Sequence, residues 1–330
     1  MADIGKPDQP VDTGGSESLL RELLGERYDE FVHRLRERLN RPITIAFMGK
    51  TGSGKSTTCN RIFGQDLFRV GAVEATTREM QFVDVPFGES SLLLVDLPGV
   101  GESMERSAEY RALYKQVLTE GLNRPPRPTD SIGSSWLGQN RHIDVVVWVI
   151  KADDRALEVD EAFYRDVLLE ACPPSQMHRV VFAISQADRI DPLRGEGSWD
   201  VEAKRPGARQ APHLEQKQQH LARMFDREPA DIPSYSAYEG YNLDVLLERV
   251  VAACPDEQVP LLVELARRGE AGESVINRRT EERAQETFWE TVKRVAEEVI
   301  TNPKVIEILV KEGLAFLGKL ILGITLPRGK

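Results

Sequence analysis

Gly49-Lys50-Thr51-Gly52-Ser53-Gly54-Lys55-Ser56 fits the pattern G-x-x-x-x-G-K-[ST], and this stretch decides the fold. It follows an apolar run at residues 42–48 that is typical of a strand, and residues 57–63 after it are typical of a helix start. A strand, a glycine-rich loop and a helix in this order form a phosphate-binding loop, because glycine lets the backbone fold around an anion. In such a loop Lys55 reaches the β- and γ-phosphates and the Ser56 hydroxyl holds Mg²⁺. The sequence therefore predicts a site for a nucleoside polyphosphate.

Composition and charge narrow the class of protein. The chain has 330 residues, of which 41% are hydrophobic and 29% are charged, as is usual for a soluble protein with a well-formed core. Its net charge of −10 argues against broad attachment to nucleic acid, which needs a basic face, so no DNA partner is expected. The N-terminal residues contain no apolar leader, and the cysteines Cys59, Cys172 and Cys254 show no metal spacing. We therefore expect a reducing, cytoplasmic location.

The pattern along the chain predicts an α/β domain followed by helices. Residues 1–16 are rich in Asp, Gly, Pro and Ser and are expected to be disordered, whereas residues 17–40 predict an amphipathic helix. From residue 41 to residue 255 strand and helix signals alternate, which is typical of a mostly parallel sheet with helices on both faces. Residues 256–330 show only helical patterns and are expected to form a helical C-terminal domain. The expected strands are 42–48, 81–85, 91–95, 144–150, 179–185 and 232–236, the expected helices are 157–170, 213–225 and 243–253, and the expected long loops are 121–141 and 192–212.

Two further motifs predict how the γ-phosphate and Mg²⁺ are bound. Asp96-Leu97-Pro98-Gly99 follows an apolar strand, so Asp96 can serve the Mg²⁺ shell and the Gly99 N–H can touch the γ-phosphate. Thr77, in the stretch Ala75-Thr76-Thr77-Arg78, can bind Mg²⁺ only while the γ-phosphate is present, which would make this segment a switch. Thr76 is its substitute.

Two more motifs predict selection of guanine. Ser185-Gln186-Ala187-Asp188 ends one strand, and a carboxylate there accepts hydrogen bonds from guanine N1–H and N2–H₂, which adenine cannot offer. Tyr235-Ser236-Ala237 ends the next strand, where backbone N–H groups can meet guanine O6. Each motif is common by itself, but ligands of α/β sheets bind at the carboxyl ends of the strands, where all of these motifs are expected.

Together, the five elements resemble a P-loop GTPase of the TrmE–Era–EngA type. The stretches 96–103 and 148–157 are similar to the YfjP/YeeP-like bacterial GTPases labelled 50S ribosome-binding GTPase, over roughly residues 17–255. The resemblance implies GTP/GDP and Mg²⁺ as ligands, and hydrolysis of GTP to GDP and phosphate. It also implies Lys55, Thr77 and Gly99 as catalytic residues and Ser56, Thr77 and Asp96 at the metal. The residues expected to bind the nucleotide are Gly49, Lys50, Thr51, Gly52, Ser53, Gly54, Lys55, Ser56, Thr57, Asp96, Gly99, Ser185, Gln186, Asp188, Ser236 and Ala237.

Three positions depart from this pattern. Val100 stands where many signalling GTPases have a glutamine that orients the attacking water, so the backbone, another residue or a partner must do this. Gly52 stands where potassium-activated relatives have asparagine, so potassium activation is not expected. Gln186 replaces the usual lysine of the guanine motif.

Asp153, Asp154 and Asp160 suggest a carboxylate cluster, but we interpret them as cap and first-turn residues of helix 157–170.

Partners stay open at this point. Residues 50–52 resemble those of septin, AIG1-type and immunity-related GTPases, which assemble through their nucleotide faces, so a homodimer through that face is one alternative. Residues 304–330 are apolar with an excess of positive charge. They would dock onto the helical domain or a second subunit, lie on an anionic membrane surface, or span the membrane. The cycle of GTP binding and hydrolysis would accordingly serve a ribosome-linked switch or a nucleotide-gated scaffold.

Overall fold

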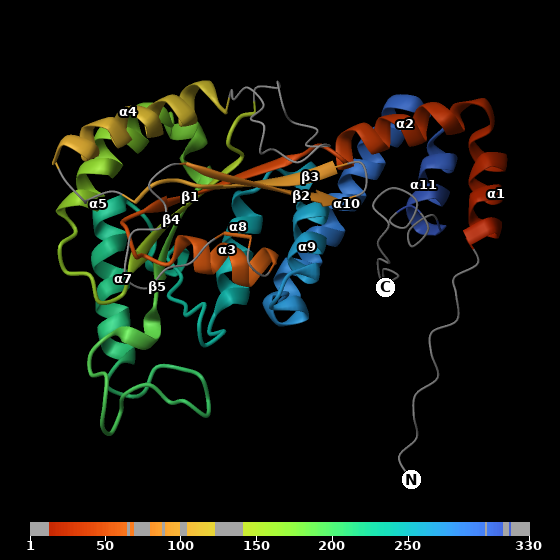
Figure 1. Ribbon diagram of the computed structural model, residues 1–330. Coiled ribbons are helices and arrows are strands. Elements are labelled where there is room, and N and C mark those ends of the chain that lie inside the picture. Colours follow the sequence, from red (N-terminus) through yellow and green to blue (C-terminus); the bar gives the residue numbers. More distant parts are fainter. Residues whose placement is uncertain are drawn as a thin grey trace, which may run out of the picture.

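Within the part of the chain that the structure describes, a five-stranded sheet lies at the centre of the molecule (Figure 1). The computed structural model describes residues 13–64, 67–68, 80–87, 90–99, 104–122, 141–300, 302–312 and 317. The strand order is β2-β3-β1-β4-β5, and only the edge strand β2 runs antiparallel to its neighbour. The strands are β1 (Ile43–Gly49), β2 (Gln81–Phe87), β3 (Ser90–Asp96), β4 (Val145–Lys151) and β5 (Val180–Ser185). The predicted mostly parallel α/β fold is confirmed.

Apolar runs in β1, β3, β4 and β5 explain why the sheet is buried on both faces. One face packs against α3 (Lys55–Phe63), α8 (Leu243–Ala253) and α9 (Val259–Arg268). The other packs against α4 (Met104–Glu120) and α7 (Ala211–Phe225), together with α5 (Glu158–Phe163), which continues through a π-turn into α6 (Leu169–Ala171). Two separate hydrophobic cores therefore lie on opposite faces of the sheet.

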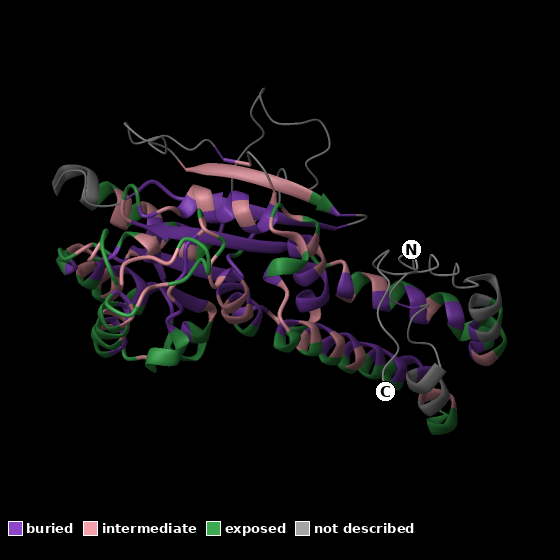
Figure 2. Ribbon diagram, turned by 90° about the horizontal axis from the view of Figure 1, so that it is seen from below, coloured by how far each residue is buried: buried purple, intermediate pink, exposed green. Residues whose placement is uncertain are grey.

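The N- and C-terminal helices extend together beyond the sheet. Helices α2 (Tyr28–Leu39) and α10 (Arg278–Val299) lie side by side, and Figure 2 shows their buried faces turned toward each other. Arg38 joins them through Glu298 at 2.7 Å and reaches Glu257 at 3.2 Å. The other helices here are α1 (Thr13–Leu24) and α11 (Pro303–Glu312).

These helices share one core cluster with the α3 face of the sheet. The boundary that we expect near residue 255 stays a prediction. No helix in the described ranges is long and apolar enough to cross a membrane.

Four elements differ from the expectations. Residues 13–16 begin α1 instead of being disordered, while residues 1–12 lie outside the described part. The expected helix 17–40 is divided because Gly25 adopts a left-handed φ of 54° after α1. Residues 232–236 form isolated bridges, from Ser234 to Ile184 and from Ser236 to Tyr241, instead of a strand, and Pro233 has no N–H to extend a ladder. We did not predict α4, and most of the expected loop 121–141 lies outside the described residues.

Candidate nucleotide site

The phosphate loop connects β1 to α3 at the carboxyl edge of the sheet. Gly54 has a φ of 91°, a left-handed conformation suited to glycine, and it directly precedes α3. A Cβ on Gly49 would overlap the carbonyl oxygen of Val149 in β4. The Lys55 ammonium donates to the carbonyl oxygens of Gly49 at 3.1 Å and Lys50 at 3.0 Å, so it lies at the mouth of the loop. The helix N-terminus and this cation together create a site that favours an anion.

Oxygen ligands suited to Mg²⁺ meet beside the loop. The Ser56 hydroxyl, in the first turn of α3, donates to Oδ2 of Asp96 at the end of β3. Asp96 is fully buried, and the parallel register pairs it with Phe47 of β1. Among the described residues no group of three or more His, Cys, Asp or Glu side chains could hold a metal. One hydroxyl and one carboxylate fit Mg²⁺, a hard cation that takes most of its remaining ligands from phosphates and water.

The loop at residues 96–99 packs directly on the phosphate loop. A Cβ on Gly99 would overlap the backbone nitrogen and Cα of Thr51, so only glycine fits there without movement of the backbone. The Leu97 N–H donates to Phe47 O at 3.2 Å and ties this loop to the end of β1. Thr76, Thr77 and Val100 lie outside the described residues.

The strand-end residues expected to select guanine also reach the phosphate loop. The Ser185 hydroxyl donates to Ser53 O at 2.5 Å, and Nε2 of Gln186 donates to Gly52 O at 2.8 Å. Gln186 has a left-handed φ of 54°, which turns the chain sharply after β5. Asp188 follows in a short 3₁₀ turn and is half-buried. Two predicted residues of this motif, Ser185 and Gln186, thus contact the loop that would hold the phosphates.

The 235–237 loop, which is expected to contact guanine O6, lies next to the 185–188 loop. The Ala187 N–H donates to Tyr235 O at 3.0 Å and so joins the two loops. Ala237 lies two residues after Tyr235 in the same loop. Ser236 is fully buried, and its hydroxyl accepts the Glu239 N–H at 3.1 Å. The Ser236 side chain thereby fixes its own loop, so any contact of this loop with a base would be made by the backbone.

Comparisons with known proteins agree with this geometry. The family model described as 50S ribosome-binding GTPase matches residues 44–173. YkfA of Escherichia coli K12 is 32% identical over 276 residues, covering 83% of this chain and 82% of YkfA. YfjP of the same organism is 34% identical over 260 residues, covering 78% and 77% of the two chains. The chain belongs to the Era-like P-loop GTPases of the YfjP group. GTPase Era of Pseudomonas aeruginosa is 28% identical over 214 residues, or 65% of this chain and 55% of Era.

In this GTPase the Lys50 side chain forms an ion cluster that the sequence did not predict. Lys50 Nζ lies 2.9 Å from Oδ2 of Asp154 and 3.0 Å from Oδ2 of Asp160. Asp160 is fully buried, and its Oδ1 accepts the Trp148 indole N–H at 3.0 Å. Asp154 accepts the Ala156 N–H at 3.0 Å. Lys50 can therefore face a nucleotide only through its backbone.

The pKa values of both Asp160 and Lys50 are raised, and for each group burial and the charge of its partner act in opposite directions. Burial raises the pKa of Asp160 above its usual value, although the Lys50 charge opposes the rise. Burial would lower the pKa of Lys50, but hydrogen bonding to Asp154 and the charge of Asp160 raise it overall. The interpretation of Asp153, Asp154 and Asp160 as helix caps is wrong, whereas the expectation that Asp160 is a first-turn residue is confirmed. Asp160 does lie in the first turn of α5, but its carboxylate binds Lys50 and Trp148, and no side chain caps that helix.

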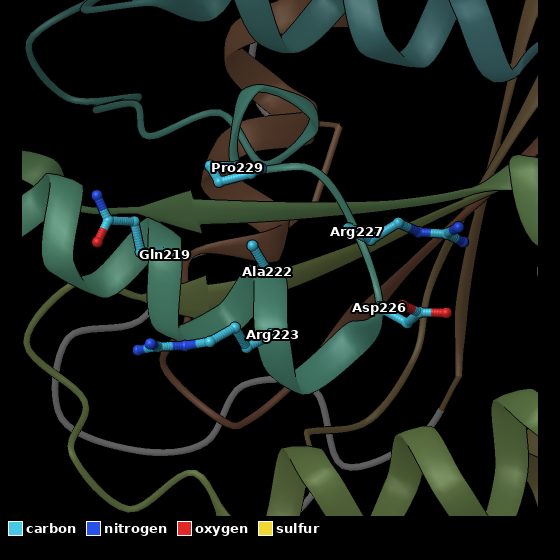
Figure 3. Close-up of a pocket in the computed structure, with 6 residues that line it drawn as sticks. All are labelled: Gln219, Ala222, Arg223, Asp226, Arg227 and Pro229. Atoms are coloured by element: carbon cyan, nitrogen blue, oxygen red, sulfur yellow. The ribbon is translucent and has the colours of Figure 1, made fainter.

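A surface hollow at the end of α7 has no connection with this site. It is lined by Gln219, Ala222, Arg223, Asp226, Arg227 and Pro229. Figure 3 shows Gln219 and Arg223 pointing away from Arg227, so the polar groups do not converge on one point. In a parallel sheet the C-terminal end of such a helix lies at the opposite edge from the phosphate loop. We assign no ligand to this hollow.

Proposed function

We propose that this GTPase binds GTP with Mg²⁺ and hydrolyses it to GDP and phosphate as a molecular switch. The observation that carries the proposal is the hydrogen bonding of Ser185 and Gln186 to the phosphate loop. They support the proposal because they hold the chain just before Asp188, the carboxylate that would select the base, against the phosphate loop. A site for phosphate alone would not need that carboxylate at its edge.

The chemistry follows from the charges around the γ-phosphate. Attack of water on the γ-phosphate spreads negative charge over its oxygens, and Lys55 and the loop N–H groups would stabilise that charge. Ser56 and Thr77 would hold Mg²⁺, with Asp96 in its outer shell, and the ion would neutralise charge on the phosphates when bound. The Gly99 N–H would contact the γ-phosphate. Because the Val100 side chain offers no hydrogen bond, the attacking water must be oriented by the backbone, another residue or a partner.

Guanine would be selected by two loops. The Asp188 carboxylate would accept the N1–H and N2–H₂ groups of guanine, and the N–H groups of Ser236 and Ala237 would meet O6. The substitution Asp188→Asn tests this assignment, because an amide matches the oxygen that xanthine carries in place of the amino group. The variant should lose affinity for GTP and gain affinity for XTP. A variant that still selects GTP over XTP would remove Asp188 from the proposal.

We infer that the protein works in the cytoplasm, and two uses of the cycle follow. The matching family model carries the description ribosome-binding, which supports a ribosome-linked switch. The alternative is a nucleotide-gated assembly through the nucleotide face, or attachment to an anionic membrane surface through residues 304–330. GTP turnover per molecule at two protein concentrations distinguishes assembly, since only assembly makes this rate rise with concentration. Sedimentation with anionic liposomes, with and without residues 304–330, tests the membrane alternative.

A further inference from the structure

Tyr114 holds the 96–99 loop, which packs on the phosphate loop. It lies on α4 and is fully buried. Its hydroxyl donates to Pro98 O at 2.6 Å. Burial raises the pKa of Tyr114 well above its ordinary value, and the charge of Asp96 adds to the rise. The hydroxyl thus holds the 96–99 loop, whose Gly99 packs against Thr51 of the phosphate loop.

The Tyr114 ring is held in place by aromatic neighbours. It packs edge-on against Trp148, with ring centroids 6.4 Å apart, and against Phe163, with centroids 5.4 Å apart. Trp148 in turn donates to Asp160, which binds Lys50 of the phosphate loop. Because the ring is fully buried between these neighbours, close packing leaves its hydroxyl little room to move. The Pro98 carbonyl is therefore bonded to a fixed point of the core.

The peptide that Tyr114 holds is the one that would sense the γ-phosphate. The Pro98 carbonyl and the Gly99 N–H belong to the same planar trans peptide, so they point in opposite directions. A hydrogen bond that fixes the carbonyl also fixes the direction of the N–H. It further polarises the peptide, which makes the N–H a stronger donor.

We propose that Tyr114 is a positioning residue for the γ-phosphate: its hydroxyl holds the peptide between Pro98 and Gly99 so that the Gly99 N–H faces the phosphate loop. The proposal rests on the proposed function, because it assumes that GTP binds in this loop. The proposed role of Tyr114 affects the binding of GTP and not that of GDP. Since GDP has no γ-phosphate, its binding does not use the Gly99 N–H.

The substitution Tyr114→Phe removes the hydroxyl and keeps the ring in its aromatic contacts. Affinities for GDP and for a non-hydrolysable GTP analogue, each with Mg²⁺, are measured by titration, together with GTP turnover. Loss of one hydrogen bond predicts roughly fivefold weaker binding of the analogue. GDP affinity should stay within about twofold of the wild type, and turnover should fall with the analogue affinity.

Tyr164→Phe is the matched control. The Tyr164 hydroxyl donates to Phe225 O at 3.0 Å, also a bond from a phenol to a backbone carbonyl, but far from the phosphate loop. This variant should lose thermal stability comparably to Tyr114→Phe and keep both nucleotide affinities. Tyr235→Phe is a second comparison, because its hydroxyl bonds Thr58 of α3 at 2.8 Å. It should affect GDP and the analogue equally.

The outcomes separate this inference from the proposed function. A selective loss of the analogue in Tyr114→Phe, absent from both comparison variants, supports the positioning role. Equal loss of GDP and the analogue, or no loss of either, overturns it and leaves the GTPase assignment intact. Failure of the wild-type protein to bind either nucleotide would overturn both.

Discussion

Replacement of Lys50 by methionine tests whether the ion pairs of Lys50 with Asp154 and Asp160 stabilise the phosphate loop. Methionine keeps most of the length of the side chain and removes the ammonium that bonds Asp154 at 2.9 Å and Asp160 at 3.0 Å. Asp160 is fully buried and would keep only the Trp148 indole N–H. The substitution therefore leaves a buried carboxylate without its cation.

Breaking a buried ion pair by removing one partner typically costs about 3–5 kcal/mol. We expect about 3 kcal/mol, because Asp160 keeps one hydrogen bond and can escape part of the penalty by binding a proton. Burial already raises its pKa, and loss of Lys50 removes the two Lys50 contributions that lower it. A folded-state pKa above the unfolded value gives stability that is present at low pH and is lost as pH rises through the folded pKa. The destabilisation should therefore be larger at about pH 8 than at about pH 5.5.

The assay is urea unfolding of both proteins at the two pH values. Arg155→Met is the control, because the Arg155–Asp191 pair is exposed, at 88% and 64% of the side-chain surfaces, and such pairs contribute about 0–1 kcal/mol. The variant Lys50→Met should also bind GDP more weakly, since the loop loses its anchor. A Lys50→Met protein as stable as the Arg155→Met control, with no dependence on pH, would refute the role of the cluster.

Three further predictions concern single residues. Lys55→Ala should abolish tight GTP binding in a titration, because it removes the cation expected to bind the phosphates, whereas the Lys50 ammonium is paired with Asp154 and Asp160; unchanged affinity would contradict that role. Gly99→Ala should reduce GTP turnover by about tenfold or more, since its Cβ overlaps the Thr51 backbone, and turnover kinetics at wild-type level would argue against the close packing. Asn277→Ala should lower stability by about 1 kcal/mol, because the side chain caps α10 by accepting the Thr280 N–H at 2.9 Å, while nucleotide affinity stays unchanged. Thermal unfolding and a GDP titration check this last result.

The sheet and the phosphate loop could be predicted because their signals are local. The β-branched run of β4 is buried on both faces, and the glycine and lysine positions of residues 49–56 carry the loop by themselves. Helix α4 was missed although Tyr110, Leu113, Tyr114 and Val117 follow helical spacing. Counting that spacing would have found it.

The ion cluster could not be predicted from local patterns. Lys50 and Asp154 are 104 positions apart, and only the parallel pairing of β1 with β4 brings them together. Acidic residues at the start of a helix predict a cap, since most such residues are exposed. Burial of Asp160 beneath Trp148 depends on tertiary packing, which overrides that preference.

The most direct test of the central claim is competition for the nucleotide site. A fluorescent GDP analogue is bound to the wild-type protein with Mg²⁺ and displaced by increasing GTP or ATP. GTP should displace it at least about 100-fold more effectively, because adenine leaves the Asp188 carboxylate and the O6-binding N–H groups without partners. Displacement by ATP at the same concentrations as GTP would contradict the account.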